Sequence, residues 1–256
     1  MIDQGEAILA RLRGEVGAAN VAVFGTVASA SMETEQPGYR PSDLLQDAAS
    51  LICFGVPVPR GAYEHTHRTT ETIWRSQNLT YRRLDTLALR FAELVEQGGG
   101  RALPIYGCYP LAVSKRGEVV GFINLVRVAE LTGIGTVGRN GLLYHRHFGS
   151  RLMLGGVVSS VALPDFVLPG GDTSGCPEDC RLCVDACPVR AISPETGRVD
   201  IMKCLAYTAR TPFMSKLLFG IQARIQPRRA ARTLNLRTID EHVLHVCSRC
   251  VQSCPY

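Results

Sequence analysis

The stretch that decides the fold lies near the end of the chain: Cys176-Pro177-Glu178-Asp179-Cys180-Arg181-Leu182-Cys183-Val184-Asp185-Ala186-Cys187-Pro188. A lone cysteine, Cys204, follows it, and a second group, Cys247-Ser248-Arg249-Cys250-Val251-Gln252-Ser253-Cys254-Pro255, closes the sequence. Both groups end in Cys-Pro. Short cysteine spacings supply several thiolates from one loop, as an iron–sulfur cluster requires. The pattern therefore predicts two [4Fe-4S] clusters.

The ligands are expected to interleave, because in two-cluster ferredoxins the fourth cysteine of one group binds the other cluster. This rule gives the first cluster Cys176, Cys180, Cys183 and Cys254, and the second cluster Cys187, Cys204, Cys247 and Cys250. The first spacing is Cys-x3-Cys, which departs from the usual Cys-x2-Cys. Two zinc sites of four thiolates each would also use eight cysteines. The repeated Cys-Pro ending favours iron–sulfur over zinc.

The composition is that of an ordinary globular protein. The chain has 256 residues, of which 46% are apolar and 20% charged, so one or two domains are expected. No apolar run is long enough for a transmembrane helix, and the N-terminus lacks a signal pattern, so we expect a cytoplasmic protein. Disulfides are typical of small secreted domains, which makes metal binding the better explanation of ten cysteines.

The formal net charge of +5 gives no case for nucleic-acid binding. Each cluster with its four thiolates carries about −2, so two clusters bring the net charge to about +1.

Hydrophobic periodicity predicts helices over residues 4–16, 69–97 and 121–131, and strands over 20–27, 50–58 and 101–105. Ser42 is expected to cap a further helix. Residues 142–144 and 151–163 resemble strands joined in a hairpin around His147. Strands alternating with helices predict an α/β or α+β domain over residues 1–170, and a ferredoxin-like module over residues 171–256.

Three stretches resemble the epoxyqueuosine reductase and reductive dehalogenase superfamily. They are the run from Thr132 to Gly155, which contains Thr132-Gly133-Ile134-Gly135-Thr136-Val137-Gly138-Arg139-Asn140-Gly141, the cysteine module with Asp200-Ile201-Met202-Lys203-Cys204, and, more weakly, residues 41–57. The resemblance implies a nitroreductase-like, cobalamin-binding domain joined to two clusters. It also implies an oxidoreductase with a low-potential electron donor of the ferredoxin or flavodoxin type.

Two departures from the family bear on the substrate. The reductases carry a catalytic aspartate after the third strand, whereas this chain has Leu103-Pro104-Ile105-Tyr106-Gly107 there. The family's C-terminal tRNA-contacting region has no counterpart before Tyr256, so the chain resembles a short branch of the family. A small-molecule substrate or a corrinoid partner protein is therefore expected, and tRNA is not.

The glycine-rich turn has three possible roles. Gly133, Gly135 and Gly138 have the spacing that lets backbone amides approach an anion, and Arg139 and Asn140 follow them. The resemblance implies contact with the tail of cobalamin, while a flavin or another cofactor is a second possibility. The third is a tight packing turn.

Other candidate residues are more simply explained. Tyr106 and Tyr109 lie where the family has its acid, and Tyr106 is the candidate proton donor, although half-buried structural tyrosines are the simpler interpretation. His145 and His147 fit a solvated hairpin tip, His65 and His67 a polar surface loop, and Cys53 a buried strand. Cys108 follows the third strand. The basic segment 212–246 fits a helix that covers the clusters, or a docking face.

Two hypotheses of function follow. In the first, two [4Fe-4S] clusters pass electrons to a cobalamin that reduces a small substrate. In the second, the chain is an electron-transfer or reductive-activation protein that reduces a corrinoid, flavin or metal centre on a partner.

Overall fold

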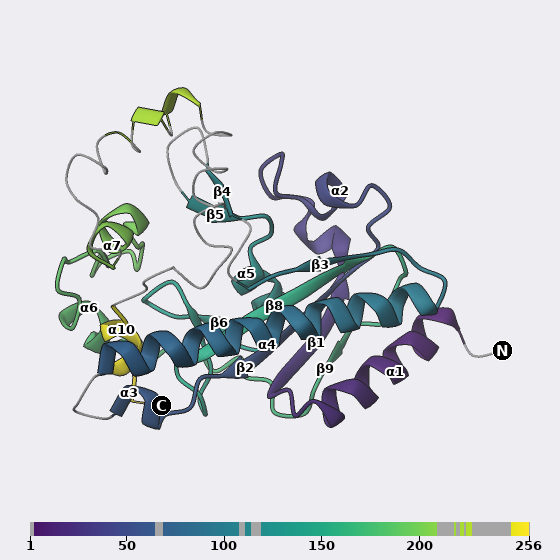
Figure 1. The fold of residues 1–256 in the computed structure, drawn as a ribbon, viewed down its shortest axis with the longest axis horizontal. Helices are drawn as coiled ribbons and strands as arrows, with labels where there is room; N and C mark the ends of the chain where they lie inside the picture. Colours follow the sequence, from purple (N-terminus) through teal and green to yellow (C-terminus); the bar gives the residue numbers. More distant parts are fainter. Residues whose placement is uncertain are drawn as a thin grey trace.

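A five-stranded antiparallel sheet forms the centre of the molecule (Figure 1). The computed structural model describes residues 3–64, 69–107, 111–113, 119–208, 218, 221–222, 224–226 and 247–255. The strand order is β3-β8-β2-β1-β9, with the strands spanning Ala102–Ile105 (β3), Leu152–Ser159 (β8), Ser50–Pro57 (β2), Val23–Ala28 (β1) and Phe166–Val167 (β9). Antiparallel pairing gives the α+β form of the predicted fold class, with helices on both faces.

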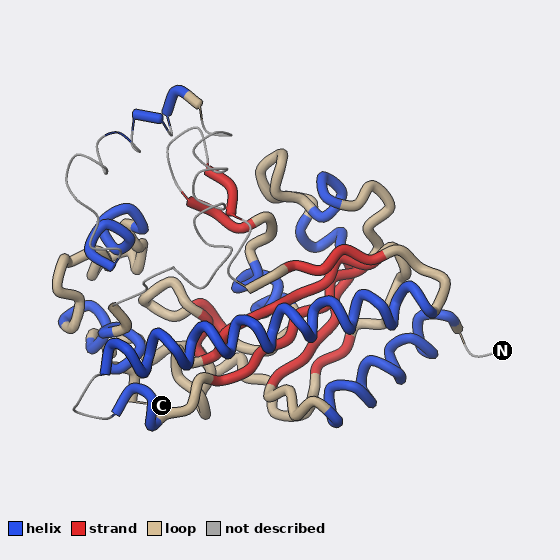
Figure 2. Tube along the Cα trace, viewed as in Figure 1, coloured by secondary structure: helices blue, strands red, loops and turns tan. Residues whose placement is uncertain are grey.

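Alternate residues of the strands supply two separate cores. Phe24, Ile52 and Phe54 point to the face covered by α1 (Gln4–Ala18) and α4 (Thr69–Gln97). Phe54 meets Phe91 of α4 edge to face, with ring centroids 4.8 Å apart. Gly155 of β8 makes this contact possible, because a Cβ atom there would lie 2.7 Å from Cζ of Phe54. Figure 2 shows the long helix α4 running across the strands of the main sheet.

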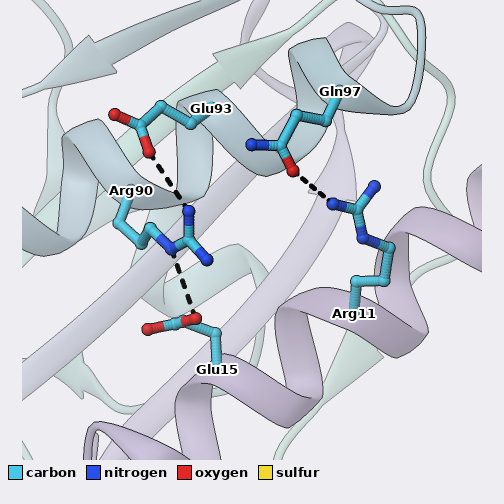
Figure 3. A network of polar contacts seen from close by, with 5 residues as sticks. All are labelled: Arg11, Glu15, Arg90, Glu93 and Gln97. Carbon is cyan, nitrogen blue, oxygen red and sulfur yellow. Dashed lines mark hydrogen bonds and ion pairs between the residues drawn. The ribbon is translucent and has the colours of Figure 1, made fainter.

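Polar contacts join the two helices outside this core (Figure 3). Arg90 of α4 pairs with Glu15 of α1 at 3.3 Å and with Glu93 of its own helix at 3.2 Å. Arg11 of α1 donates a hydrogen bond to Gln97 at the end of α4. These side chains are partly exposed, so the apolar core below them contributes most of the packing energy.

The opposite face carries shorter elements. These are η1 (Ser29–Met32), α2 (Pro41–Leu44) and α5 (Leu125–Leu131), and the core on this side includes Val27, Leu51, Cys53, Val128 and Ile134. The helix predicted from residue 121 begins only at Leu125, because Asn124 caps it by accepting a hydrogen bond from the Arg127 amide at 3.2 Å. Residues Val119–Gly121 form strand β5, paired with β4 (Leu111–Val113).

Two local predictions are wrong. Ser42 lies inside α2, whose N-cap is Arg40, and its hydroxyl donates to the Glu33 carboxylate at 2.6 Å. The expected hairpin around His147 does not join β7 to β8. Strand β7 (Leu143–Tyr144) pairs with β6 (Thr136–Val137) across the glycine-rich turn, while β8 pairs with β2 and β3 in the main sheet.

The cysteine-rich residues form a module at the start of α4. It contains α6 (Leu182–Asp185), α7 (Ile201–Thr208) and α10 (Arg249–Gln252), and Figure 1 shows α10 beside α3 (Gly61–Glu64) and the N-terminal end of α4. Val251 of α10 packs with Val58, Tyr63 and Ile73 in a small third core. In the described part of the chain, no helix combines the length and apolar character needed to cross a membrane.

Candidate functional site

Four cysteines line one small cavity. They are Cys176, Cys180, Cys183 and Cys254, the set that the sequence assigns to the first cluster. Three come from the first cysteine group and Cys254 comes from the last residues of the chain. The rest of the wall consists of Leu182 and five residues from outside the module: Gly138, Arg139, Asn140, Tyr144 and Ser150. We call this space the first cluster cavity.

Short turns bring the cysteines of the first cavity together. The Cys180 amide donates to the Pro177 carbonyl at 3.1 Å, and α6 then carries Cys183 to a buried position. At the other end of the chain the Cys254 amide donates to the Val251 carbonyl at 3.2 Å, directly after α10. Because α6 and α10 pack against each other, the two sequence groups form one site.

The second set of cysteines gathers around Cys250. The pKa of Cys250 is raised to about 12, mainly by burial and then by the neighbouring Cys204, Cys247, Cys183 and Cys187. Three of these neighbours are its predicted co-ligands. The fourth, Cys183, belongs to the first set, so the two sites adjoin. A buried cysteine that disfavours its own thiolate needs the positive charge of bound iron to become a ligand.

A backbone amide already contacts one of these sulfurs. The Ala191 N–H lies 3.2 Å from the Sγ of Cys187, which accepts the hydrogen bond. Contacts of this kind stabilise sulfur ligands and tune the potential of the cluster that they bind.

The arrangement suits clusters better than single ions. In a zinc site the four thiolate sulfurs all bind the same metal ion, each at about 2.3 Å. In the described residues, no three His, Cys, Asp or Glu side chains are arranged to hold one metal ion. In a [4Fe-4S] cluster each thiolate binds a different iron, so the cysteines line a cavity. The ring around the first cavity fits that geometry.

Contacts with the sheet domain hold the second set in place. Gln77 of α4 donates to the Tyr63 hydroxyl at 3.3 Å and to the Ser248 hydroxyl at 3.2 Å. Ser248 lies between Cys247 and Cys250, and Cys250 itself packs against the small core around Tyr63. Burial raises the pKa of Tyr63. Helices α3 and α4 therefore lie against the second cysteine set.

The glycine-rich turn mostly serves the protein's own packing. A Cβ atom on Gly135 would lie 2.6 Å from the Tyr144 carbonyl oxygen, and one on Gly138 would lie 3.1 Å from that of Leu142. The amides of Gly133 and Gly138 donate to Glu130 and Leu142 carbonyls, at 3.0 and 2.8 Å. These contacts favour the packing alternative for the glycines. Contact with a cobalamin stays a prediction.

Arg139 and Asn140 are placed beside the first cluster cavity instead. The Arg139 guanidinium donates to the Glu178 carbonyl at 2.5 Å and to the Pro194 carbonyl at 3.3 Å, so it joins the turn to two loops of the cysteine module. Asn140 is buried and donates to the Ser150 hydroxyl at 3.0 Å. Its carboxamide oxygen accepts from the Leu142 amide at 3.2 Å, which fixes the turn.

His145 is not at a solvated tip, and that interpretation is wrong. Its side chain is buried, with Nε2 3.0 Å from the Gly170 carbonyl and Nδ1 accepting from the His147 amide at 3.1 Å. Burial lowers the pKa of His145. The neighbouring Asp172 accepts from the Arg146 amide at 2.5 Å. The sequence did not reveal this burial because His145 and its partner Gly170 lie 25 residues apart.

An acid does lie near the end of β3, although none follows that strand in the sequence. Asp85 of α4 accepts a long hydrogen bond of 3.4 Å from the Gly107 amide, and burial raises its pKa. Tyr106 is 37% exposed in the same turn. Its role as a proton donor stays a prediction. Tyr109, Cys108, His65, His67 and most of the basic segment lie outside the described residues.

Cys53 has the structural role that the sequence suggested. It is fully buried in β2, and burial raises the pKa of its thiol to about 12.

Comparison with known proteins agrees with this arrangement. Residues 176–256 match the model of the 4Fe-4S double cluster binding domain. The chain is 26% identical over 226 residues to the epoxyqueuosine reductase of Lactococcus garvieae, covering 85% of this chain and 54% of that one. It is 42% identical over 79 residues to that of Synechocystis, covering 31% and 26%.

Solved structures extend the likeness to the sheet domain. An epoxyqueuosine reductase from Streptococcus thermophilus superposes with a TM-score of 0.59 at 18% identity, over 97% of this chain and 66% of that one. A reductive dehalogenase studied for B12-dependent dehalogenation gives 0.59 at 17%, over 92% and 36%. The chain is thus similar in sequence to epoxyqueuosine reductases and shares a fold with both groups of reductases. It spans about half the length of the Lactococcus garvieae relative.

Proposed function

We propose that this protein is an iron–sulfur reductase in which two [4Fe-4S] clusters deliver electrons to a cobalamin associated with the sheet domain. The observation that carries the proposal is the first cluster cavity, where Cys254 completes a ring begun 78 positions earlier by Cys176. The match of residues 176–256 to a double cluster domain supports both sites. The shared fold of nearly the whole chain supports the cobalamin.

The residues of this chain would perform several tasks around the clusters. The described structure holds the two cysteine sets next to each other, which suits electron transfer from one cluster to the other. Packing of Val251 and Cys250 against Tyr63 keeps the second set against the sheet domain and excludes water from that contact. A bound cobalamin would supply the reductive chemistry, because its metal can take up electrons that protein side chains cannot.

The glycine-rich turn carries the residues predicted to contact the cobalamin. Of the five residues predicted to contact it, Gly135 and Gly138 pack against their own turn, and Arg139 and Asn140 face the first cluster cavity. Gly133 faces open space and has a φ of +75°. Near the exposed end of β3, Tyr106 would donate a proton to a small substrate, and the Asp85 carboxyl would help to hold the turn that carries it.

The comparisons do not favour a pure electron carrier, since the relatives that they name are reductases. One solved epoxyqueuosine reductase carries an epoxyqueuosine-modified tRNA stem loop. We propose a small-molecule substrate for this shorter chain.

Anaerobic reconstitution tests the proposal. The purified protein is expected to bind about eight iron and about eight sulfide ions, and to change the visible spectrum of added aquacobalamin. Dithionite should then reduce the bound cobalamin faster in the wild type than in a Cys254→Ala variant. Zinc in place of iron would refute the clusters. Full iron with no spectral change on adding cobalamin would refute the cobalamin alone.

A further inference from the structure

One buried donor beside the first cluster cavity has no partner. The Nε–H of Arg139 is shielded from solvent and makes no hydrogen bond within the described residues. The two Nη groups of the same guanidinium are both used, by the carbonyls of Glu178 and Pro194. Leaving a buried donor unsatisfied costs about 1–3 kcal/mol, so such a group in a folded protein needs an explanation.

The position of Arg139 suggests what the missing partner is. Arg139 lines the cavity that Cys176, Cys180, Cys183 and Cys254 surround. Arg139 therefore shares the wall of this cavity with four predicted sulfur ligands, and cluster sulfur atoms accept hydrogen bonds from N–H groups. The two Nη contacts fix the plane of the guanidinium, because Arg presents its donors in a rigid fork.

We propose that Arg139 donates the hydrogen bond of its Nε–H to a sulfur of the first [4Fe-4S] cluster and thereby raises the reduction potential of that cluster. The reduced cluster carries one more negative charge than the oxidised cluster. A charged donor therefore stabilises the reduced form more. This inference depends on the proposed clusters and is independent of the cobalamin.

The same contact gives the glycine-rich turn a second task. The hydrogen bonds of Asn140 to Ser150 and Leu142 fix the turn, and the fixed turn holds Arg139 in place. The sheet domain thus supplies a residue that sets the potential of a cluster whose ligands all lie in the module.

Two substitutions separate the hydrogen bond from the charge. Arg139→Lys keeps the positive charge but has no N–H at the position of Nε, and Arg139→Gln removes both. Arg181→Gln is the matched control, because it removes an exposed charge from the same module, where solvent screens it. Iron and sulfide are counted first. The two midpoint potentials are then measured by anaerobic redox titration followed by electron paramagnetic resonance.

Both Arg139 variants are expected to lower one of the two potentials and leave the other unchanged. A tenfold weaker stabilisation of the reduced cluster corresponds to about 59 mV for a one-electron couple. Arg181→Gln should leave both potentials unchanged. The inference is overturned if Arg139→Lys retains the wild-type potential, since charge alone would then explain any effect of Arg139→Gln. It is also overturned if Arg181→Gln shifts the same potential equally.

A second measurement uses the unaltered chain, in case the variants lose the first cluster. Wild-type protein is prepared with arginine labelled with ¹⁵N only in the guanidinium group, and the reduced clusters are studied by pulsed electron paramagnetic resonance. A ¹⁵N coupling to a cluster is expected. Its absence in protein with full iron overturns this inference only, whereas absence of iron overturns the proposed function.

Discussion

The division of the last three cysteines between two clusters can be tested by counting iron. Cys254 lines the first cluster cavity with Cys176, whereas Cys250, only four positions earlier, lies among Cys187, Cys204 and Cys247. If this is correct, Cys254→Ala removes the same cluster as Cys176→Ala. Cys250 and Cys254 would then bind different clusters although they are four positions apart, whereas Cys176 and Cys254 would bind the same cluster although they are 78 positions apart.

The magnitude follows from four iron atoms per cluster. The wild type should hold about eight iron atoms, and each single variant about four. The double variant Cys176→Ala with Cys254→Ala should also hold about four, because the second change removes a ligand of a cluster already lost. The double variant Cys187→Ala with Cys254→Ala should hold almost none. Iron and acid-labile sulfide are measured after anaerobic reconstitution, with electron paramagnetic resonance as a second readout.

Cys53→Ala serves as the control, since Cys53 is buried in β2 and belongs to neither set. It should retain about eight iron atoms. The interleaved assignment is refuted if Cys176→Ala with Cys254→Ala loses almost all the iron, because Cys176 and Cys254 would then bind different clusters. That result is the one expected if each cluster were bound within one sequence group.

Three further predictions concern the surroundings of the clusters. Gly135→Ala places a Cβ atom 2.6 Å from the Tyr144 carbonyl oxygen and should lower the free energy of unfolding of the metal-free protein by about 1–3 kcal/mol in denaturant titrations. The control Gly14→Ala lies in open space on α1 and should raise that free energy by about 0.5–1 kcal/mol. Unchanged stability of Gly135→Ala would contradict a packing role. Burial holds the pKa of His145, whose charged neighbours are Arg146, His147 and Asp172, below its usual 6.5, so the unfolded chain takes up a proton first as the pH falls. The contribution of His145 to stability is therefore complete above about pH 6.5 and decreases below it. His145→Gln should flatten the pH dependence of stability in urea unfolding between about pH 7.5 and 5.5, and an equal slope in both proteins would be evidence against this. Gln77→Leu removes the hydrogen bonds to Tyr63 and Ser248, at about 0.5–1.5 kcal/mol each, and should speed the loss of iron to a chelator. Asn78→Leu removes a hydrogen bond to Trp74 within the same helix and should leave the rate of iron loss unchanged.

The two cysteine groups and much of the secondary structure could be predicted because their determinants are local. Cysteine spacing identified both groups, and hydrophobic periodicity placed α4 at its observed bounds, Thr69–Gln97. The predicted bounds of β1, β2 and β3 agree with the observed bounds to within three residues at each end. The wrong predictions concern short segments that could pair with more than one partner. Residues 142–144 pair with β6 rather than with β8, and register between short strands depends on tertiary packing.

The sequence by itself supplied eight cysteines with the spacing of cluster ligands, since cysteine spacing and thiolate chemistry belong to the residues themselves. Only the tertiary structure decided what surrounds those cysteines. It brought the glycine-rich turn of the sheet domain to the first cluster cavity, buried His145 against residue 170, and placed Asp85 of α4 beside the end of β3. Each of these contacts joins segments that are distant in the chain. Their partners are chosen by the packing of helices on the sheet, which no local pattern of residues specifies.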